Sequence, residues 1–284
     1  MKRFDYFKPR SLEEALRLKE TTPDAWFIAG GTDLLVKIKD NEIQTSALIS
    51  LRSIQELSSA EVNKVARIGA LTTINDLIKN PALCENFLLL VDAAKQLGSV
   101  QIRNTATIGG NLCNCSPAAD TALPLLVLDA KVRLQSIQDS REMRLSEFFM
   151  GPGESCLSSD EIMTDILLEP FPPSAKAAFL KIGRVKMDLA IASVALLLEM
   201  EGERCRKVRI AAGSVAPVPL RLSKVEELLE GEPVSKELVT EAQKMASEVV
   251  APITDIRASE EYRRHIVGVL VRRALENVLG WSQA

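Results

Sequence analysis

Apolar and polar positions in the first part of the chain follow two different periods. Residues 11–20 place apolar side chains at helical spacing and predict a helix, with Ser11 as its N-cap and Glu14 at the capping-box position. Apolar runs at residues 25–30 and 46–51 predict strands, and a second helix is expected directly after Gly30 and Gly31. The pattern therefore indicates a compact α/β unit.

From about residue 56 to residue 170 the apolar pattern again mixes both periods. The segments that resemble strands are residues 65–70, 131–137 and 163–170. The segments with helical character are residues 72–80, 87–99 and 123–130. This organisation predicts a second α/β layer.

Residues 169–176, with the sequence EPFPPSAK, interrupt the pattern. Proline blocks both helix continuation and ladder hydrogen bonding, so a domain boundary is expected here. Beyond it, residues 179–184 and 194–201 predict two strands, or a strand and a helix, and residues 207–217 predict a strand that ends in a turn. The last hundred residues are expected to be largely helical, ending in a core-facing helix over residues 260–280.

Composition and charge narrow the class of protein. The chain has 284 residues, 46% of them apolar, which is enough for a large core divided over two or three domains. A net charge of -3 gives no electrostatic footprint for nucleic acid, and no apolar run has the length of a signal peptide or a membrane span. The five scattered cysteines favour reduced thiols without a structural disulfide. We therefore expect a cytoplasmic protein with no nucleic-acid partner.

The segment around Gly30 and Gly31 is the first candidate site. Exposed main-chain N–H groups in a glycine turn at a helix start can bind an anion, and glycine lets a phosphate approach closely. The hydroxyl of Thr32 can also donate to a phosphate, whereas Asp33 would repel one and is expected to cap the helix or to act through its backbone N–H. A plain tight turn is the alternative interpretation.

A second segment, Thr107 to Asn111, repeats this arrangement with Gly109 and Gly110. Two such segments suit a dinucleotide, because main-chain amides of both glycine pairs could close on its diphosphate while Asp120 accepts from a ribose hydroxyl. Asp120 could instead be the N-cap of the helix over residues 123–130. Neither GxGxxG nor GxxxxGK[ST] occurs, so the Rossmann and P-loop folds lack their fingerprints.

Metal chemistry in this chain is disfavoured. Cys113 and Cys115 are the only closely spaced cysteine pair, and an iron–sulfur cluster needs further ligands nearby. The single histidine, His265, provides neither a zinc site nor a catalytic triad, and we expect it on a helix surface. No catalytic acid or base is therefore assigned.

At this point a family resemblance is clear. The segments FIAGGTDLLVKIK (residues 27–39) and QIRNTATIGGNLCNCSPAADTALPLLVLDA (101–130) are similar to the FAD-binding medium subunit of the molybdenum hydroxylases, the xanthine dehydrogenase and carbon monoxide dehydrogenase family. Further matches are FFMGPGES, FLKIGRVKMDLAIASVA, GSVAPVPLR and EYRRHIVGVLVRRAL. The resemblance implies an α+β protein with a vanillyl-alcohol-oxidase (PCMH)-type FAD-binding fold. Its parts would be two α/β subdomains, residues 1–55 and 56–172, and an α+β C-terminal domain, residues 173–284.

The resemblance also implies which residues contact FAD. Asp120 would meet the adenosine portion, Leu97 and Met163 would be apolar neighbours of the cofactor, and Lys181 would be a cationic contact. By their chemistry alone, Leu97 and Met163 could be ordinary core residues and Lys181 a solvated strand residue. The two pyrophosphate segments would consist of Phe27, Ile28, Ala29, Gly30, Gly31, Thr32, Asp33 and Leu34, and of Thr107, Ile108, Gly109, Gly110 and Asn111.

In that family the redox reactions are carried out by cofactors that are bound to several different chains. The resemblance implies a small partner subunit with two [2Fe–2S] clusters and a large molybdopterin-binding subunit, with NAD or another compound as electron acceptor. The segment FFMGPGES favours xanthine dehydrogenase-like members. Two alternatives are a stand-alone flavin-dependent oxidase with its own organic substrate and a non-catalytic nucleotide-binding module.

Overall fold

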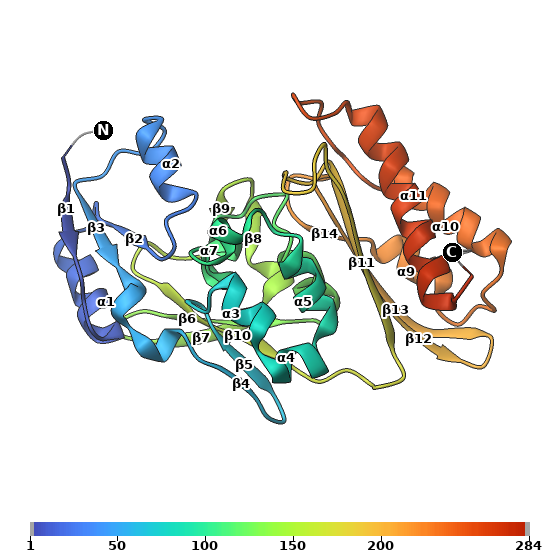
Figure 1. The fold of residues 1–284 in the computed structure, drawn as a ribbon, viewed down its shortest axis with the longest axis horizontal. Coiled ribbons are helices and arrows are strands. Elements are labelled where there is room, and N and C mark those ends of the chain that lie inside the picture. The colour runs from blue at the N-terminus through green and yellow to red at the C-terminus, as the bar shows by residue number, and fades with distance from the viewer. Residues whose placement is uncertain (1–2, 282–284) are drawn as a thin grey trace.

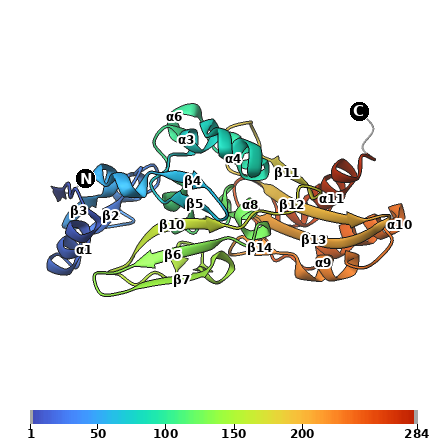
Figure 2. The ribbon, with the colours of Figure 1, turned by 90° about the horizontal axis from the view of Figure 1, so that it is seen from below.

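The three larger β-sheets follow one another along the long axis of the molecule, each with its own helices (Figure 1, Figure 2). The computed structural model describes residues 3–281. Residues 1–2 and 282–284, which the expected domain limits include, lie outside the described part. Within residues 3–281, no helix is both long enough and apolar enough to cross a lipid bilayer.

The N-terminal sheet has three parallel strands in the order β1-β3-β2. Helix α1 begins after Ser11, whose side chain accepts a hydrogen bond from the N–H of Glu14, as expected. The carboxylate of Glu14 accepts from the N–H of Arg10, so the capping box is shifted by one residue. The elements are β1 (Asp5–Phe7), α1 (Leu12–Thr21), β2 (Trp26–Ile28), α2 (Leu34–Lys39) and β3 (Ala47–Ser50), followed by short 3₁₀ turns at Leu51–Ser53 and Gln55–Leu57.

The middle sheet has five antiparallel strands in the order β4-β5-β10-β6-β7, so its central strand comes last in the sequence. Its strands are β4 (Ala60–Val62), β5 (Ala66–Gly69), β6 (Lys131–Gln135), β7 (Ser140–Arg144) and β10 (Ile162–Leu168). Its helices are α3 (Ile74–Lys79), α4 (Pro81–Asn86), α5 (Leu88–Lys95), α6 (Val100–Arg103), α7 (Ile108–Cys113) and α8 (Ala122–Val127). A 3₁₀ turn (Leu145–Glu147) and a hairpin of β8 (Phe149–Gly151) and β9 (Glu154–Ser155) complete the layer.

The C-terminal sheet is antiparallel in the order β11-β12-β13-β14. Both faces of its long strand β12 are buried: Val194 and Leu196 face the core of the C-terminal helices, whereas Ala195 and Leu197 belong to the core of the middle layer. This burial explains the continuous apolar run that left strand or helix open in the sequence. The elements are β11 (Lys176–Ile182), β12 (Ala192–Glu201), β13 (Arg204–Gly213), β14 (Leu220–Arg221), α9 (Ser223–Leu229), α10 (Lys236–Glu248) and α11 (Glu260–Leu279).

Polar contacts fasten the C-terminal sheet to the middle layer. Arg221 and Arg209 donate to the carbonyl oxygens of Leu126 and Val127, at 3.2 and 3.1 Å. These carbonyls end helix α8, where orphan acceptors and the helix dipole favour cations. The N–H of Ser214 donates to the carbonyl of Pro117 at 2.7 Å. The C-terminal sheet therefore forms a fixed wall of the middle layer.

Most long elements agree with the sequence prediction, and the differences lie in short ones. The terminal helix α11 covers the expected residues, and its apolar stripe packs in the core. The second glycine segment, expected as a loop, forms the first turn of helix α7. The last hundred residues are less helical than expected, because three of the four C-terminal strands reach into them. Strands β1, β4, β7, β8, β9 and β14 and helices α4 and α6 were not predicted.

Candidate cofactor site

The first glycine segment is a tight turn between β2 and α2. Gly31 has a left-handed backbone with φ of 75°, which costs glycine no steric penalty. A Cβ atom at Gly30 would collide with the carbonyl oxygen of Thr105. Within residues 3–281 no acceptor is bound to the main-chain N–H groups of residues 30–33, which are therefore free for an anion. Asp33 precedes α2 but makes no side-chain capping bond. Its carboxylate accepts from the hydroxyl of Thr32 at 3.4 Å, so its N–H is the group left for an anion.

The second glycine segment uses its main-chain donors within the protein. Of the N–H groups of residues 108–111, two donate to the carbonyls of Ala70 and Thr72 and two donate to Thr107. The expectation that main-chain amides of Gly109 and Gly110 bind a diphosphate stays a prediction, and in this structure both amides already donate within the protein. These glycines instead permit close packing, since a Cβ atom at Gly109 would lie 2.5 Å from the Cβ of Ala70.

Side chains of the second segment still offer donors. Thr107 is the N-cap of α7, and its Oγ1 accepts from the N–H of Gly110 at 3.1 Å, leaving the hydroxyl hydrogen free. The side-chain oxygen of Asn111 accepts from the hydroxyl of Thr121 at 2.6 Å. That bond fixes the amide orientation, and its NH₂ group is left without an acceptor in the part of the chain that the structure describes.

The two glycine segments lie against each other, as the sequence predicts. Gly30 touches the backbone just before Thr107, and a Cβ atom at Gly110 would lie 3.9 Å from the Cβ of Ala29. Lys37 of helix α2 donates to the side-chain oxygen of Asn114, at the end of α7, at 2.9 Å. Free donors from residues 30–33 and from the side chains of α7 therefore share one location.

Asp120 and Lys181 form a buried ion pair that joins two layers. The Lys181 ammonium donates to Oδ2 of Asp120 at 2.6 Å and to the carbonyl of Gln96 at 3.0 Å. Both side chains are almost fully buried, at 4% and 6% exposure, so Lys181 is not the solvated residue of the alternative interpretation. Asp120 is not a helix cap either, because Thr121 occupies the cap position of α8.

Burial raises the pKa of Asp120 to about 6, although the Lys181 ammonium pulls it in the opposite direction. Its second oxygen, Oδ1, is buried and has no hydrogen-bond partner among the described residues. An unsatisfied buried acceptor is costly, and a donor on a bound molecule would remove that cost. Asp120 therefore has the free acceptor expected of a ligand contact.

The remaining predicted residues are mostly packed in cores. Leu97 and Met163 belong to the largest apolar cluster, and Ile108 lies beneath α7 in the same cluster. Leu97 nevertheless directly follows Gln96, whose backbone carbonyl accepts a hydrogen bond from Lys181. In the N-terminal layer, Phe27 packs toward α1, whereas Ile28 and Leu34 pack on the opposite side of the sheet.

A cavity of about 640 Å³ lies where the turn after α5 meets the end of β11. Lys181 lines it from one side, and Gly98 and Arg103 line it from the other. Arg103 donates to the carbonyls of Leu97 and Gly98, at 2.9 and 2.8 Å, and shapes this turn. The sequence analysis did not identify Gln96 or Arg103. Both act through hydrogen bonds to backbone carbonyls, and such bonds require no particular residue type at the accepting position.

The thiols of Cys113 and Cys115, which flank Asn114, are unreactive. All five cysteines are free. Burial raises the pKa of Cys115 to about 11 and raises that of Cys113 as well, so both stay protonated near neutral pH. Within residues 3–281, no group of three or more His, Cys, Asp or Glu side chains is arranged to hold a metal ion. His265 lies exposed on α11.

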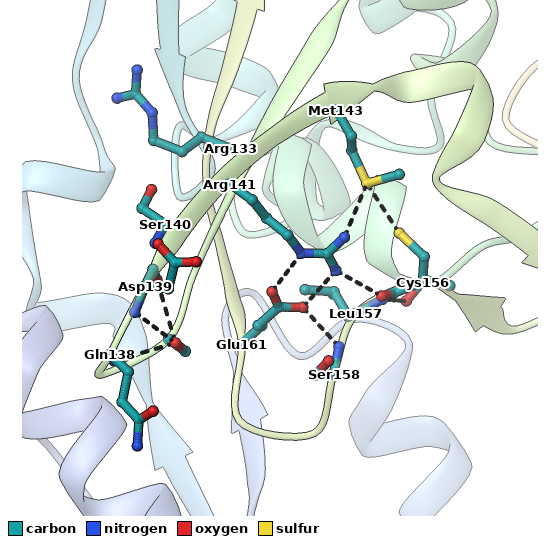
Figure 3. A network of polar contacts seen from close by, with 12 residues as sticks. Arg133, Gln138, Asp139, Ser140, Arg141, Met143, Cys156, Leu157, Ser158 and Glu161 are labelled. Carbon is teal, nitrogen blue, oxygen red and sulfur yellow. Dashed lines mark hydrogen bonds and ion pairs between the residues drawn. The ribbon is translucent and has the colours of Figure 1, made fainter.

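The hairpin that carries Cys156 is held by a surface network (Figure 3). Arg141 forms an ion pair with Glu161 at 2.7 Å and donates to the carbonyl of Cys156. The Cys156 thiol in turn lies 3.1 Å from the Met143 sulfur. The network ties β7 to the segment after β9, and burial raises the pKa of the Cys156 thiol, which keeps it protonated near neutral pH.

Two family models match the chain in succession. The model described as the FAD binding domain in molybdopterin dehydrogenase matches residues 2–170. The model described as the CO dehydrogenase flavoprotein C-terminal domain matches residues 177–278. Together they cover both parts on either side of the proline-rich segment.

Individual proteins align over nearly the whole chain. It is 32% identical to the nicotinate dehydrogenase FAD-subunit of Eubacterium barkeri, over 98% of this chain and 97% of that protein. It is 31% identical to the glyceraldehyde dehydrogenase medium chain of Sulfolobus acidocaldarius, over 97% and 98%. Among solved structures, carbon monoxide dehydrogenase from Hydrogenophaga pseudoflava superposes with a TM-score of 0.95 at 32% identity, covering 99% of both chains. The expected α+β flavoprotein fold is confirmed.

Proposed function

Because this chain belongs to the FAD-binding medium subunits of the molybdenum hydroxylases, we propose that it moves electrons from the [2Fe–2S] clusters of a small partner subunit to NAD or another acceptor. A large molybdopterin-binding subunit would then oxidise the substrate. The chain is an FAD-containing oxidoreductase subunit. FAD supplies, when bound, the ability to take up and release electrons one or two at a time. The residues of this chain supply its position and its electrostatic surroundings.

The meeting of the two glycine segments is the observation that carries this proposal. We propose that the free N–H groups of residues 30–33 bind the diphosphate, helped by the hydroxyls of Thr32 and Thr107 and by the amide of Asn111. Neutral donors suit a diphosphate, because they place no negative charge against it. In this proposal Gly109 and Gly110 serve by letting helix α7 approach the first turn.

We further propose that Oδ1 of Asp120 accepts a hydrogen bond from the bound cofactor. Lys181 holds the other oxygen and keeps the carboxylate in one orientation. Leu97 is proposed as an apolar neighbour of the cofactor because it adjoins the Lys181 contact. For Met163 the support is indirect. The carbonyl of the next residue, Thr164, accepts a hydrogen bond from the N–H of Ala70, and the carbonyl of Ala70 accepts one from the N–H of Gly109 in the second glycine segment.

The domain limits 1–55, 56–172 and 173–284 are proposed from the sequence and agree with the succession of three sheets. We propose the cytoplasm as the location, because five free thiols are typical of a reducing compartment. A xanthine dehydrogenase-like substrate stays a prediction: relatives at similar identity are named for nicotinate, glyceraldehyde and carbon monoxide. The substrate depends on the large subunit.

The first test is the cofactor content of the purified chain. Wild-type protein should show the flavin absorption spectrum, and Thr32→Val should lower FAD affinity by about tenfold, the effect of losing one charge-assisted hydrogen bond. Thr240→Val is the matched control, because its hydroxyl only bonds to the carbonyl of Lys236 on the exposed face of α10. A protein that stays colourless with excess FAD would refute the proposal.

The second test separates electron transfer from the two alternatives. Rapid mixing with a chemically reduced [2Fe–2S] partner should bleach the flavin absorption, whereas organic substrates added to this chain alone should not. Bleaching by an organic substrate without any partner would instead identify a stand-alone oxidase. FAD binding without reduction by the partner would identify a nucleotide-binding module.

A further inference from the structure

One lysine reaches from the N-terminal layer to the middle layer beside the two glycine segments. Helix α2 follows the first glycine segment and α7 contains the second, and the two helices belong to different layers (Figure 1). The Lys37 ammonium on α2 donates to the side-chain oxygen of Asn114, the C-cap residue of α7, at 2.9 Å. The bond joins positions 77 residues apart in the sequence, so it forms only when the fold brings the two segments together.

The charge of Lys37 is not compensated in the free chain. Its acceptor is the neutral amide oxygen of Asn114, and it forms no ion pair with any residue from 3 to 281. Lys181, a second lysine at the proposed cofactor site, is by contrast neutralised by Asp120 at 2.6 Å. Partly buried charges are usually paired, so the unpaired ammonium of Lys37 is suited to an anionic ligand.

Lys37 stands between the free donors of the two segments. It lies one helical turn after Asp33, whose carbonyl accepts from its N–H at 3.1 Å. Helical side chains lean toward the N-terminal end of their helix, so the stem of Lys37 leans toward the free N–H groups of residues 30–33. On α7, Asn111 and Asn114 are three residues apart, which makes them neighbours on one helix face at about 5–6 Å. The ammonium therefore adjoins the free amide donors of α7 as well.

The groups next to Lys37 at the end of α7 leave its charge intact. Burial raises the pKa of Cys115 to about 11, and the Lys37 ammonium opposes that rise, which places the ammonium near this thiol. The thiol stays protonated near neutral pH and does not neutralise the lysine. Because the side-chain oxygen of Asn114 accepts from Lys37, its amide orientation is fixed. The NH₂ group of Asn114 has no acceptor among the described residues, so it adds a further free donor.

We infer that Lys37 is a further cofactor-binding residue, whose ammonium is positioned by Asn114 to meet a phosphate of the dinucleotide. This inference rests on the proposed function. A diphosphate carries negative charge on each phosphate, whereas the N–H groups, hydroxyls and amide proposed to bind it are all neutral. Lys37 supplies the missing charge, and a charge-assisted hydrogen bond is about twice as strong as a neutral one. A lysine that only fastened α2 to α7 would be served equally well by a carboxylate at position 114.

The first test titrates the flavin-stripped full chain with FAD and follows flavin fluorescence at low and at high salt. Lys37→Met should lower FAD affinity by about tenfold or more at low salt, and by less at high salt, because ions screen the charge that it removes. Lys37→Arg keeps the charge and its donors and should retain most of the affinity. Lys39→Met is the matched control: Lys39 lies exposed on the same helix and forms no ion pair or hydrogen bond within residues 3–281.

The second test separates a cofactor contact from a structural fastening. Asn114→Asp places a carboxylate where Lys37 already donates, so the two side chains should form an ion pair. A fastening role predicts wild-type FAD affinity in this variant. A cofactor role predicts an affinity lowered by about tenfold or more, because the lysine is neutralised and a negative charge faces the diphosphate. The urea midpoint of the stripped variant should not fall in either case, which shows that it folds.

The outcomes distinguish this inference from the proposed function. Wild-type protein that binds no FAD would refute the proposed function itself. Wild-type binding, with equal FAD affinity in Lys37→Met and Lys39→Met, would overturn only the role of Lys37. A loss in Lys37→Met that is independent of salt, or that is equally large in Lys37→Arg, would also overturn it by assigning Lys37 to the packing of α2. Wild-type affinity in Asn114→Asp would overturn it in favour of the fastening role.

Discussion

The Asp120–Lys181 pair gives a prediction whose size depends on pH. Lys181→Met keeps most of the buried stem of the side chain but removes the ammonium that lies 2.6 Å from Oδ2 of Asp120. The carboxylate is then left buried with neither oxygen paired. Its pKa in the folded protein must rise further, because burial no longer has an opposing charge.

The magnitude follows from proton linkage. In the wild type the pKa of Asp120 is raised from 3.8 to about 6, so the folded state holds its proton longer than the unfolded state. Stability therefore falls as pH rises from 3.8 to about 6, by roughly 3 kcal/mol in all, and then levels off. In Lys181→Met the fall continues above pH 6, at about 1.4 kcal/mol per pH unit. The difference between the two proteins should therefore grow with pH above about 6, by at most about 1.4 kcal/mol per pH unit, until the raised pKa of Asp120 in the variant is passed.

The assay is urea unfolding of flavin-stripped protein at several pH values between about 5 and 8. Lys181→Met with Asp120→Asn should lose the extra pH dependence, since no buried carboxylate remains. Lys95→Met is the control, because Lys95 pairs with Asp92 at the surface, where an ion pair contributes less than about 1 kcal/mol. A difference between wild type and Lys181→Met that does not change with pH would refute the reasoning.

Three further outcomes are expected. Gly109→Ala places a Cβ atom 2.5 Å from that of Ala70 and should lower the unfolding free energy by about 1–3 kcal/mol, measured in urea. Arg263→Met removes a buried guanidinium bonded to Asp255 and to two carbonyls and should cost about 3 kcal/mol or more by the same measurement. Cys115, whose pKa is raised to about 11, should react with maleimide at neutral pH at least about tenfold more slowly in folded than in unfolded protein; equal rates would contradict its burial.

Sequence patterns predicted the features that depend on neighbours in the chain. The Ser11 cap, the turn at Gly30 and Gly31 and the stripe of α11 each follow from residues a few positions apart. The helical form of residues 108–113 was missed because its two glycines read as a turn. The order of the middle sheet could not be predicted, since its central strand β10 pairs with strands far away in the sequence.

For the candidate site, too, the residues could be named from the sequence, but the contacts between them could not. Family resemblance named both Asp120 and Lys181, but only the fold shows that they bind each other, 61 residues apart. The same holds for Gly109, whose sequence context predicts a free amide although the carbonyl of Ala70 already accepts from it. The sequence thus shows which residues carry hydrogen-bond donors. Tertiary contacts decide which of these donors remain free to bind a ligand.

These contacts make the C-terminal sheet part of the proposed cofactor site. Lys181 holds Asp120, the N–H of Ser214 holds the carbonyl of Pro117, and arginines on β13 and β14 hold the end of α8. All of these anchors fall on the short segment between α7 and the end of α8, which directly follows the second glycine segment.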